Sequence, residues 1–266
     1  TTALLGEAGL DWAYSEMFQS LDAPAMRACL DLSLRLSREC GTMVHFAETH
    51  DNNRLAATSK ALARFRCALS ALLSHEGAFG VANGVEWYAT EKIDVHGSSP
   101  LNWGARENQL EALRQVNRLL REHPAFHAGA RLEPVAVEPA DCIGLLRRPP
   151  EGPAVLVLAN PDGHASRRVS WPAGLEPGLR GPLRDRLGGQ GVPIGERGDR
   201  LHCELAPLTV LCLEALGAAA TTPPAAAPFS AAPEAVLRQQ YRALALEAHV
   251  LHAGGLGDVD AGAVGA

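Results

Sequence analysis

The residues best suited to chemistry lie in one polar segment that follows an apolar, strand-like run. The run begins at Val44, and the segment contains His50, Asp51, Asn52 and Arg54. Polar and charged groups at the end of a buried strand cost free energy, so they usually serve a site. A carboxylate beside an imidazole, followed by amide and guanidinium groups, suits a sugar or another polyhydroxylated ligand. We also expect Arg54 to pair with a nearby carboxylate.

Two other interpretations of this segment remain open from the residues alone. Asp51 is a good N-cap for the helix expected after it, because its carboxylate can accept a backbone N–H. His45, Glu48 and His50 are candidate metal ligands, but only Glu48 and His50 share a face of an extended strand. Two ligands are too few for a catalytic zinc site. We therefore predict neither a metal nor a cofactor.

The polar, Gly-rich stretch 86–104 is a second candidate ligand-binding region. Trp87 and Trp103 lie in it. Aromatic faces stack on sugar rings, but both rings could equally pack over the rim of the fold. Glu86 could bind hydroxyl groups, although a solvated carboxylate is the simpler interpretation. No Gly-x-Ser-x-Gly elbow marks a serine nucleophile in the sequence.

The composition excludes several classes of protein. The chain has 266 residues, 47% of them hydrophobic, and a formal net charge of −6. That charge argues against general binding to nucleic acid or anionic membranes. No apolar run approaches the ~20 residues that span a bilayer. The six cysteines are scattered, with no Cys-x-x-Cys pair, so we expect reduced thiols in a cytoplasmic protein.

Residues 1–125 alternate strand and helix signals. That order predicts parallel strands covered by helices, with polar segments at the carboxyl ends of the strands. Barrel enzymes place their chemistry there. A doubly wound sheet has the same alternation, but no Gly-x-Gly-x-x-Gly marks a nucleotide site. The expected strands are 2–6, 13–19, 42–49 and 78–85, and the expected helices are 24–40, 54–75 and 107–122.

The pattern changes near Arg131. Short strand candidates between Pro- and Gly-rich turns predict a small antiparallel β-sandwich over 131–217. Residues 218–232 are typical of an Ala/Pro-rich linker, and 233–266 of a helix to about 252 followed by a disordered tail. The sequence thus predicts four parts: the strand–helix region 1–130, the β-sandwich 131–217, the linker 218–232 and the C-terminal segment 233–266. The strand candidates are 135–137, 142–146, 155–160, 168–171, 202–205 and 209–214.

Three motifs carry a resemblance to a known family. They are Leu4-Leu5-Gly6-Glu7-Ala8, Phe46-Ala-Glu-Thr-His50-Asp51-Asn52 and Leu113-Arg-Gln-Val-Asn-Arg-Leu-Leu-Arg-Glu-His-Pro124. In this order they resemble the second half of the α-amylase superfamily, glycoside hydrolase family thirteen, and the resemblance covers about residues 1–217. It implies an α/β fold, a partial (β/α)₈ TIM barrel (about strands five to eight) followed by a small antiparallel β-sandwich and a C-terminal helix.

The resemblance also implies roles for individual residues. Glu7 matches the family's acid/base glutamate after strand five, but the interval to the next strand is short, which makes Glu16 the alternative. A helix-start carboxylate is the structural alternative for Glu7. Asp51 matches the aspartate that stabilises the transition state, and His50 matches a substrate-binding histidine. The family's nucleophilic aspartate lies upstream of Thr1, so we expect a fragment of a longer polypeptide that is inactive alone.

The run Gly84-Val-Glu-Trp-Tyr-Ala-Thr-Glu-Lys92 is similar to a segment of maltosyltransferase-like bacterial glucan enzymes. The implied partner is an α-glucan or maltooligosaccharide substrate, processed by a retaining hydrolase or transglycosylase. The alternative function is a non-catalytic carbohydrate-binding or regulatory module that kept the fold. The catalytic candidates are Glu7 and Asp51, and the substrate-binding candidates are His50, Asn52, Arg54, Glu86, Trp87 and Trp103.

Overall fold

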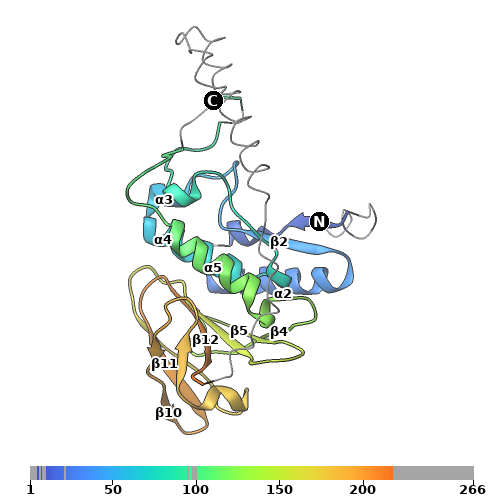
Figure 1. Cartoon of the computed structure of the whole chain (residues 1–266), viewed down its shortest axis with the longest axis vertical. Coiled ribbons are helices and arrows are strands. Elements are labelled where there is room, and N and C mark those ends of the chain that lie inside the picture. Colours follow the sequence, from blue (N-terminus) through green and yellow to red (C-terminus); the bar gives the residue numbers. More distant parts are fainter. Residues whose placement is uncertain are drawn as a thin grey trace, which may run out of the picture. The chain divides into compact units, whose positions relative to one another are not determined.

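The computed structural model describes residues 5, 7, 10–20, 22–94, 96–97 and 101–217 (Figure 1). Every described residue belongs to the first of the chain's two units, 1–221. The strand expected at 2–6 lies outside the described residues except for Leu5, which is helical. The expected linker at 218–232 and the helix and tail at 233–266 also lie outside them.

The N-terminal half alternates short parallel strands with helices (Figure 1). Strand β2 pairs in parallel with β1 on one side and β3 on the other. The carboxyl ends of the three strands therefore meet at one edge, and the described strands form an open sheet. The elements are β1 (Trp12–Tyr14), α2 (Ala23–Glu39), β2 (Thr42–Phe46), α3 (Leu55–Thr58), α4 (Lys60–Leu73), β3 (Phe79–Gly80) and α5 (Leu110–Glu122).

Side-chain caps mark where helices α2 and α4 begin. Asp22 accepts a 2.8 Å hydrogen bond from the Ala25 N–H and starts α2, with a proline in the first turn, close to the expected start at residue 24. The single helix expected over 54–75 is wrong, because Ser59 is extended (φ −164°, ψ 133°) and separates α3 from α4. Its hydroxyl accepts the Leu62 N–H at 3.4 Å and caps α4.

The strands of this half are shorter than the sequence predicts. Strand β1 covers three residues, and a 3₁₀ helix, η1 (Glu16–Gln19), follows it where 13–19 was expected to continue extended. Strand β2 ends at Phe46 instead of residue 49. Strand β3 covers only two residues of the expected 78–85. The polar segments after the strands therefore begin earlier than expected.

The C-terminal half consists of antiparallel strands in two sheets. One sheet has the order β4-β5-β6-β12-β8-β9 and the other the order β10-β11-β7. Four further short 3₁₀ helices lie along the described chain: η2 (His75–Gly77) and η3 (Val85–Trp87) before α5, and η4 (Pro124–Phe126) and η5 (Pro177–Arg180) after it. The strands are β4 (Arg131–Pro134), β5 (Ile143–Arg148), β6 (Val155–Asn160), β7 (Arg167–Pro172), β8 (Leu183–Asp185), β9 (Gly191–Val192), β10 (Gly195–Arg197), β11 (Arg200–Leu205) and β12 (Thr209–Ala215).

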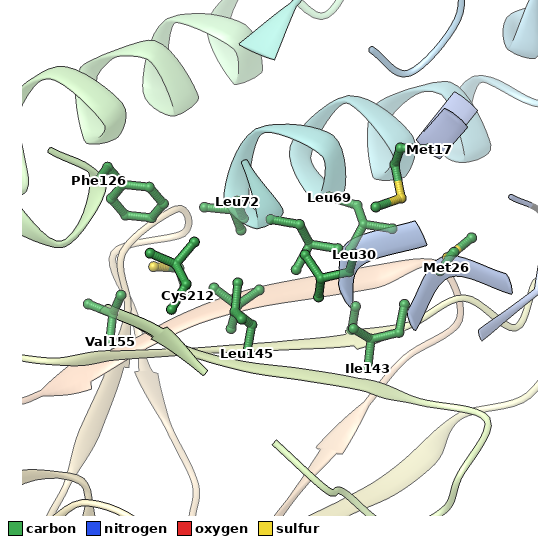
Figure 2. Close-up of a cluster of buried hydrophobic side chains, with 14 of the residues drawn as sticks. Met17, Met26, Leu30, Leu69, Leu72, Phe126, Ile143, Leu145, Val155 and Cys212 are labelled. Carbon is green, nitrogen blue, oxygen red and sulfur yellow. The ribbon is translucent and has the colours of Figure 1, made fainter. Parts of the chain in front are cut away.

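The six-stranded sheet is buried on both faces. On one face Leu145 and Cys212 pack against Leu30 of α2 and Leu72 of α4, which Figure 2 shows pointing down onto the strands. Residues on the other face, such as Leu146, share a second core with the three-stranded sheet. Two buried faces explain why these strands read as continuous apolar runs. The order of layers is therefore helices, six-stranded sheet, three-stranded sheet.

The strand predictions for this half are largely confirmed, with one error and three omissions. Strand β6 has the expected bounds 155–160, and β5, β7, β11 and β12 overlap the expected strands. The strand expected at 135–137 is wrong, because the first strand is Arg131–Pro134. Strands β8, β9 and β10 were not predicted, since each has only two or three residues and little apolar sequence.

A buried arginine of β5 joins the strands to the end of α4. Arg147 donates from Nη1 to the carbonyl oxygens of Leu72 (3.0 Å) and Ser74 (2.8 Å) and from Nε to that of Ala125 (2.8 Å). The guanidinium also lies 4.1 Å from the ring centroid of Phe126. A cation is favourable at a helix C-terminus because the last carbonyls there lack partners. This one side chain therefore satisfies three carbonyl groups.

All six cysteines are free thiols. Cys67, Cys142, Cys203 and Cys212 are buried, whereas Cys40 is exposed. Among the described helices, none is both long and apolar enough to cross a membrane.

Candidate functional site

The carboxyl edge of the parallel sheet carries a hollow that includes two of the predicted site residues. The hollow has a volume of about 360 Å³ and is lined by His50, Asp51, Lys92, Ile93 and Asp94. The first two residues follow β2, and the other three belong to the long segment after β3. The structure thus brings together two segments that are about forty residues apart in the sequence.

His50 and Asp51 form the polar wall of this hollow. The His50 Nε2 and Asp51 Oδ2 atoms are 3.4 Å apart, and the side chains are 49% and 80% exposed. Both groups are accessible to a ligand in the described chain. Lys92, the last residue of the run 84–92, adds a cation that was not among the predicted site residues, while Asp94 accepts the His96 N–H at 2.9 Å. An imidazole, an ammonium group and carboxylates together can donate to and accept from hydroxyl groups.

The neighbouring residues hold this loop in place. The Thr49 hydroxyl donates to Asn52 Oδ1 at 2.6 Å and accepts the Asp51 N–H at 3.4 Å. Asn52 therefore uses its carbonyl oxygen within the loop and keeps its amide nitrogen for other partners. The interpretation of Asp51 as a helix cap is wrong, because α3 begins after Arg54 and no side chain caps it.

Arg54 has a buried structural role, which corrects its predicted contact with substrate. Its side chain is fully buried, its Nε lies 2.7 Å from Glu48 Oε1, and its Nη1 donates to the Asn83 carbonyl at 2.8 Å. The other Glu48 oxygen accepts the Leu55 N–H at 2.7 Å. Burial raises the pKa of Glu48, although the Leu55 N–H and the Arg54 charge oppose that shift. The expected carboxylate partner of Arg54 is thus Glu48.

Glu86, Trp87 and Trp103 lie beside one another but not in the hollow at His50. The ring centroids of Trp87 and Trp103 are 5.7 Å apart at 42°, and Trp103 is 78% exposed. Trp87 is partly buried, and its carbonyl accepts a 2.7 Å hydrogen bond from the Asn102 side chain. The Glu86 carbonyl accepts the Gln109 N–H at 2.9 Å. Trp103 is thus accessible for stacking on a ligand, and Trp87 supports it.

The two candidate acids, Glu7 and Glu16, are both exposed. Glu7 lies in a turn, and Glu16 lies in the first turn of η1, directly after β1. Neither lines the hollow that contains His50 and Asp51. Among the described residues, no three His, Cys, Asp or Glu side chains gather closely enough to hold a metal ion.

One face of the parallel sheet carries exposed aromatic side chains near this edge. Trp12 and Tyr14 of β1 are 52% and 46% exposed, and their ring centroids are 5.6 Å apart. Tyr14 makes an edge contact with Phe46 of β2 at 4.8 Å. The Phe46 ring lies directly against Gly80 of β3, where an added Cβ would be 2.3 Å from the ring. The described residues leave much of this aromatic face accessible.

Comparisons with known proteins agree with this architecture at the level of fold. No family model matches the sequence, and no curated protein matches it. Among solved structures, the maltogenic α-amylase AmyB from Thermotoga neapolitana is similar with a TM-score of 0.60 and 15% identity, over 79% of this chain and 52% of that enzyme. An α-amylase from H. orenii is similar with a TM-score of 0.57 and 14% identity, over 79% and 50%.

A third similar structure is the α-amylase from Geobacillus thermoleovorans in complex with acarbose. Its TM-score is 0.54 at 13% identity, over 74% of this chain and 45% of that enzyme. The chain thus spans about half the length of the α-amylases that it matches. At this level of identity the likeness concerns the fold, and the described chain shares the α-amylase fold over that half.

Proposed function

We propose that this chain is part of an α-glucan-active glycoside hydrolase or transglycosylase of the α-amylase type. The observation that carries the proposal is the hollow at the carboxyl edge of parallel strands, where His50 and Asp51 meet the segment after β3. Enzymes with parallel strands and outer helices place their chemistry at that edge. The shared α-amylase fold and the acarbose bound to one such enzyme support an α-glucan or maltooligosaccharide as the substrate.

The exposed aromatic face supports the proposal that further strands belong to the same fold. Trp12 and Tyr14 lie on β1, which pairs only with β2 among the described strands. Exposed apolar clusters mark surfaces that take part in an interaction, and packing against a further strand is one such interaction. We propose that residues 1–130 are the second half of a (β/α)₈ barrel and that 131–217 form its β-sandwich domain, with the remaining strands upstream of Thr1.

The proposed mechanism is a retaining double displacement. An aspartate from the upstream half attacks the anomeric carbon while Glu7 protonates the leaving glycosidic oxygen. Glu7 then removes a proton from water, or from a sugar hydroxyl in transglycosylation, as that oxygen attacks the glycosyl–enzyme ester. Asp51 binds sugar hydroxyls and stabilises the oxocarbenium-like transition state by its charge. His50 donates a hydrogen bond to a hydroxyl group.

A non-catalytic carbohydrate-binding or regulatory module is the second candidate function. The observation that favours it is the separation of Glu7 from the hollow that holds Asp51. Such a module would bind a maltooligosaccharide through His50 and Trp103 without cleaving it. In either case the free thiols suit a reducing compartment, and we propose a cytoplasmic protein.

The test uses the full-length polypeptide and a maltooligosaccharide such as maltotriose. We expect Glu7→Gln and Asp51→Asn each to lower cleavage by about a thousandfold or more at unchanged melting temperature, because each removes a charge or proton used in the transition state. Asp31→Asn, on the exposed surface of α2, is the matched control and should keep full activity.

Three results would contradict parts of this proposal. Unchanged rates in either site variant would remove that residue from the mechanism. Binding of maltotriose without cleavage by the intact full-length protein would instead favour the binding module. Cleavage by the 266-residue chain alone would contradict the proposed upstream nucleophile.

A further inference from the structure

A second, cationic hollow lies on the outer face of the three-stranded sheet. Strand β11 alternates between the core, where Leu201 and Cys203 are buried, and the outer face, which carries Arg200 and His202 (β10 and β11, Figure 1). This outer hollow has a volume of about 440 Å³. Its lining includes Arg200, His202 and Arg197 of β10.

Two arginines of the outer hollow lie directly opposite each other on neighbouring strands. Arg197 and Arg200 are direct cross-strand partners that flank the two-residue turn at Gly198 (φ +64°). Like charges directly opposite in an antiparallel pair are destabilising. Among the described residues, Arg197 makes no ion pair or side-chain hydrogen bond. A bound anion would relieve the repulsion and pair with both guanidinium groups.

Arg200 is held in position before any ligand arrives. Its Nε donates to the Ser170 hydroxyl at 3.0 Å and its Nη2 to the Ser170 carbonyl at 2.9 Å. Glu138 also lines the hollow and lies 3.5 Å from the same Nε, but its side chain is 71% exposed, so solvent screens this ion pair. These contacts leave Nη1 without a protein partner and fix the plane of the guanidinium. Preorganised donors of this kind bind oxyanions at low entropic cost.

The floor of the outer hollow is shaped by a close ring contact. The His202 ring lies against Gly195, where an added Cβ would be 2.4 Å from Nε2, so a larger residue at that position would displace the ring. Arg168 at the far rim pairs with Glu204 at 2.7 Å and is therefore neutralised. The uncompensated positive charge thus comes from Arg197, with Arg200 shared between Glu138 and solvent.

We infer that this outer hollow binds a phosphate monoester of small-molecule size. Arginine pairs recognise phosphate oxygens by forked hydrogen bonds, and the imidazole adds a third donor. A volume of about 440 Å³ falls in the range of ordinary small-ligand pockets. The six-stranded sheet separates this hollow from the helices, so it is distinct from the site at His50 and its existence does not depend on the proposed glycosidase activity.

The experiment measures binding to the full 266-residue chain by isothermal titration calorimetry. The probes are inorganic phosphate, a hexose 6-phosphate and the uncharged hexose. We expect saturable binding of the two phosphates, weakened at higher salt because the contacts are ionic, and none of the hexose. Arg197→Gln should weaken phosphate binding by about tenfold, the size of one charge-assisted hydrogen bond.

A matched control and a second variant keep the test decisive. Arg131→Gln, on the exposed edge of the other sheet, removes the same charge and should leave binding unchanged. Arg200→Gln should weaken phosphate binding more than Arg197→Gln does. If Arg200→Gln unfolds the protein, the solvent-facing Arg197→Gln variant alone tests the inference. Tighter binding of hexose 6-phosphate than of phosphate supports a phosphate monoester, and equal binding of the two would overturn the assignment to a monoester. No saturable binding below about 10 mM, or equal weakening by Arg131→Gln, would overturn the inference.

Discussion

The stability of this chain should fall as the pH drops from 6.5 to 4, and His45 is the main reason. His45 lies on the helix-facing side of β2 and is fully buried, and neither ring nitrogen has a hydrogen-bond partner. Burial, together with the nearby charges of Arg147 and His75, lowers the pKa of His45 to about 4. The folded protein therefore keeps this imidazole neutral at a pH where the unfolded chain protonates it.

The sign and size of the effect follow from linkage. With a pKa near 6.5 unfolded and about 4 folded, the unfolded state binds more protons between these values, so the free energy of unfolding rises with pH across that window. For one such group the loss between pH 7 and pH 4.5 is about 2 kcal/mol. That is a large part of the stability of an ordinary domain. Burial also lowers the pKa of His75, which adds a loss in the same direction.

The assay is urea unfolding followed by circular dichroism at pH 7, 5.5 and 4.5, for the original chain and for His45→Leu. Because the ring nitrogens are unpartnered, an apolar side chain of similar size should be neutral or stabilising at pH 7. The variant should lose about 2 kcal/mol less than the original chain on going to pH 4.5, while His75 and the carboxylates contribute equally to both. An identical pH dependence in the two proteins would show that His45 is not the group that titrates.

Three further predictions concern buried contacts. Arg54→Met should destabilise the fold by about 3 kcal/mol at pH 7, because it leaves Glu48 buried without its partner; a drop in melting temperature that is reversed by adding Glu48→Gln checks this. Arg147→Met should cost about 3 kcal/mol in urea unfolding, since three carbonyl groups lose their donor. Gly80→Val should lower the melting temperature, because its Cβ would overlap the Phe46 ring; retention of the original melting temperature would contradict that contact.

Helix start and stop residues and continuous apolar runs made part of the fold predictable. The start of α2 follows from Asp22 and the proline after it, and its end follows from Gly41. Strand β6 is a continuous apolar run, which suits a strand buried on two sides. The break at Ser59 was not predictable in the same way, since a serine inside an Ala/Leu-rich segment can continue a helix or cap a new one. Tertiary packing decides between the two.

The candidate site was predictable only in part. His50 and Asp51 are adjacent in the sequence and follow a strand, so their proximity required no tertiary information. Lys92 joins them from a long segment without periodicity, and nothing in its own neighbourhood indicates where it lies. The buried Arg54 donates to the carbonyl of Asn83, about thirty residues away. Because the sequence does not show that contact, it was equally compatible with an exposed Arg54 that binds substrate and with a buried ion pair.

The buried pair of Glu48 and Arg54 explains how an exposed loop can hold a defined geometry. Replacing such a pair with apolar residues is often neutral for stability, so its net contribution to folding is small. Its contacts instead join the start of the loop, at Glu48, to its end, at Arg54 Nε and the Leu55 N–H, and Arg54 ties the loop to the segment after β3 through the Asn83 carbonyl. His50 therefore projects from a base fixed by buried hydrogen bonds, and its position relative to the second segment does not depend on the exposed side chains themselves. Rigid support beneath exposed polar groups is what positioning a ligand requires.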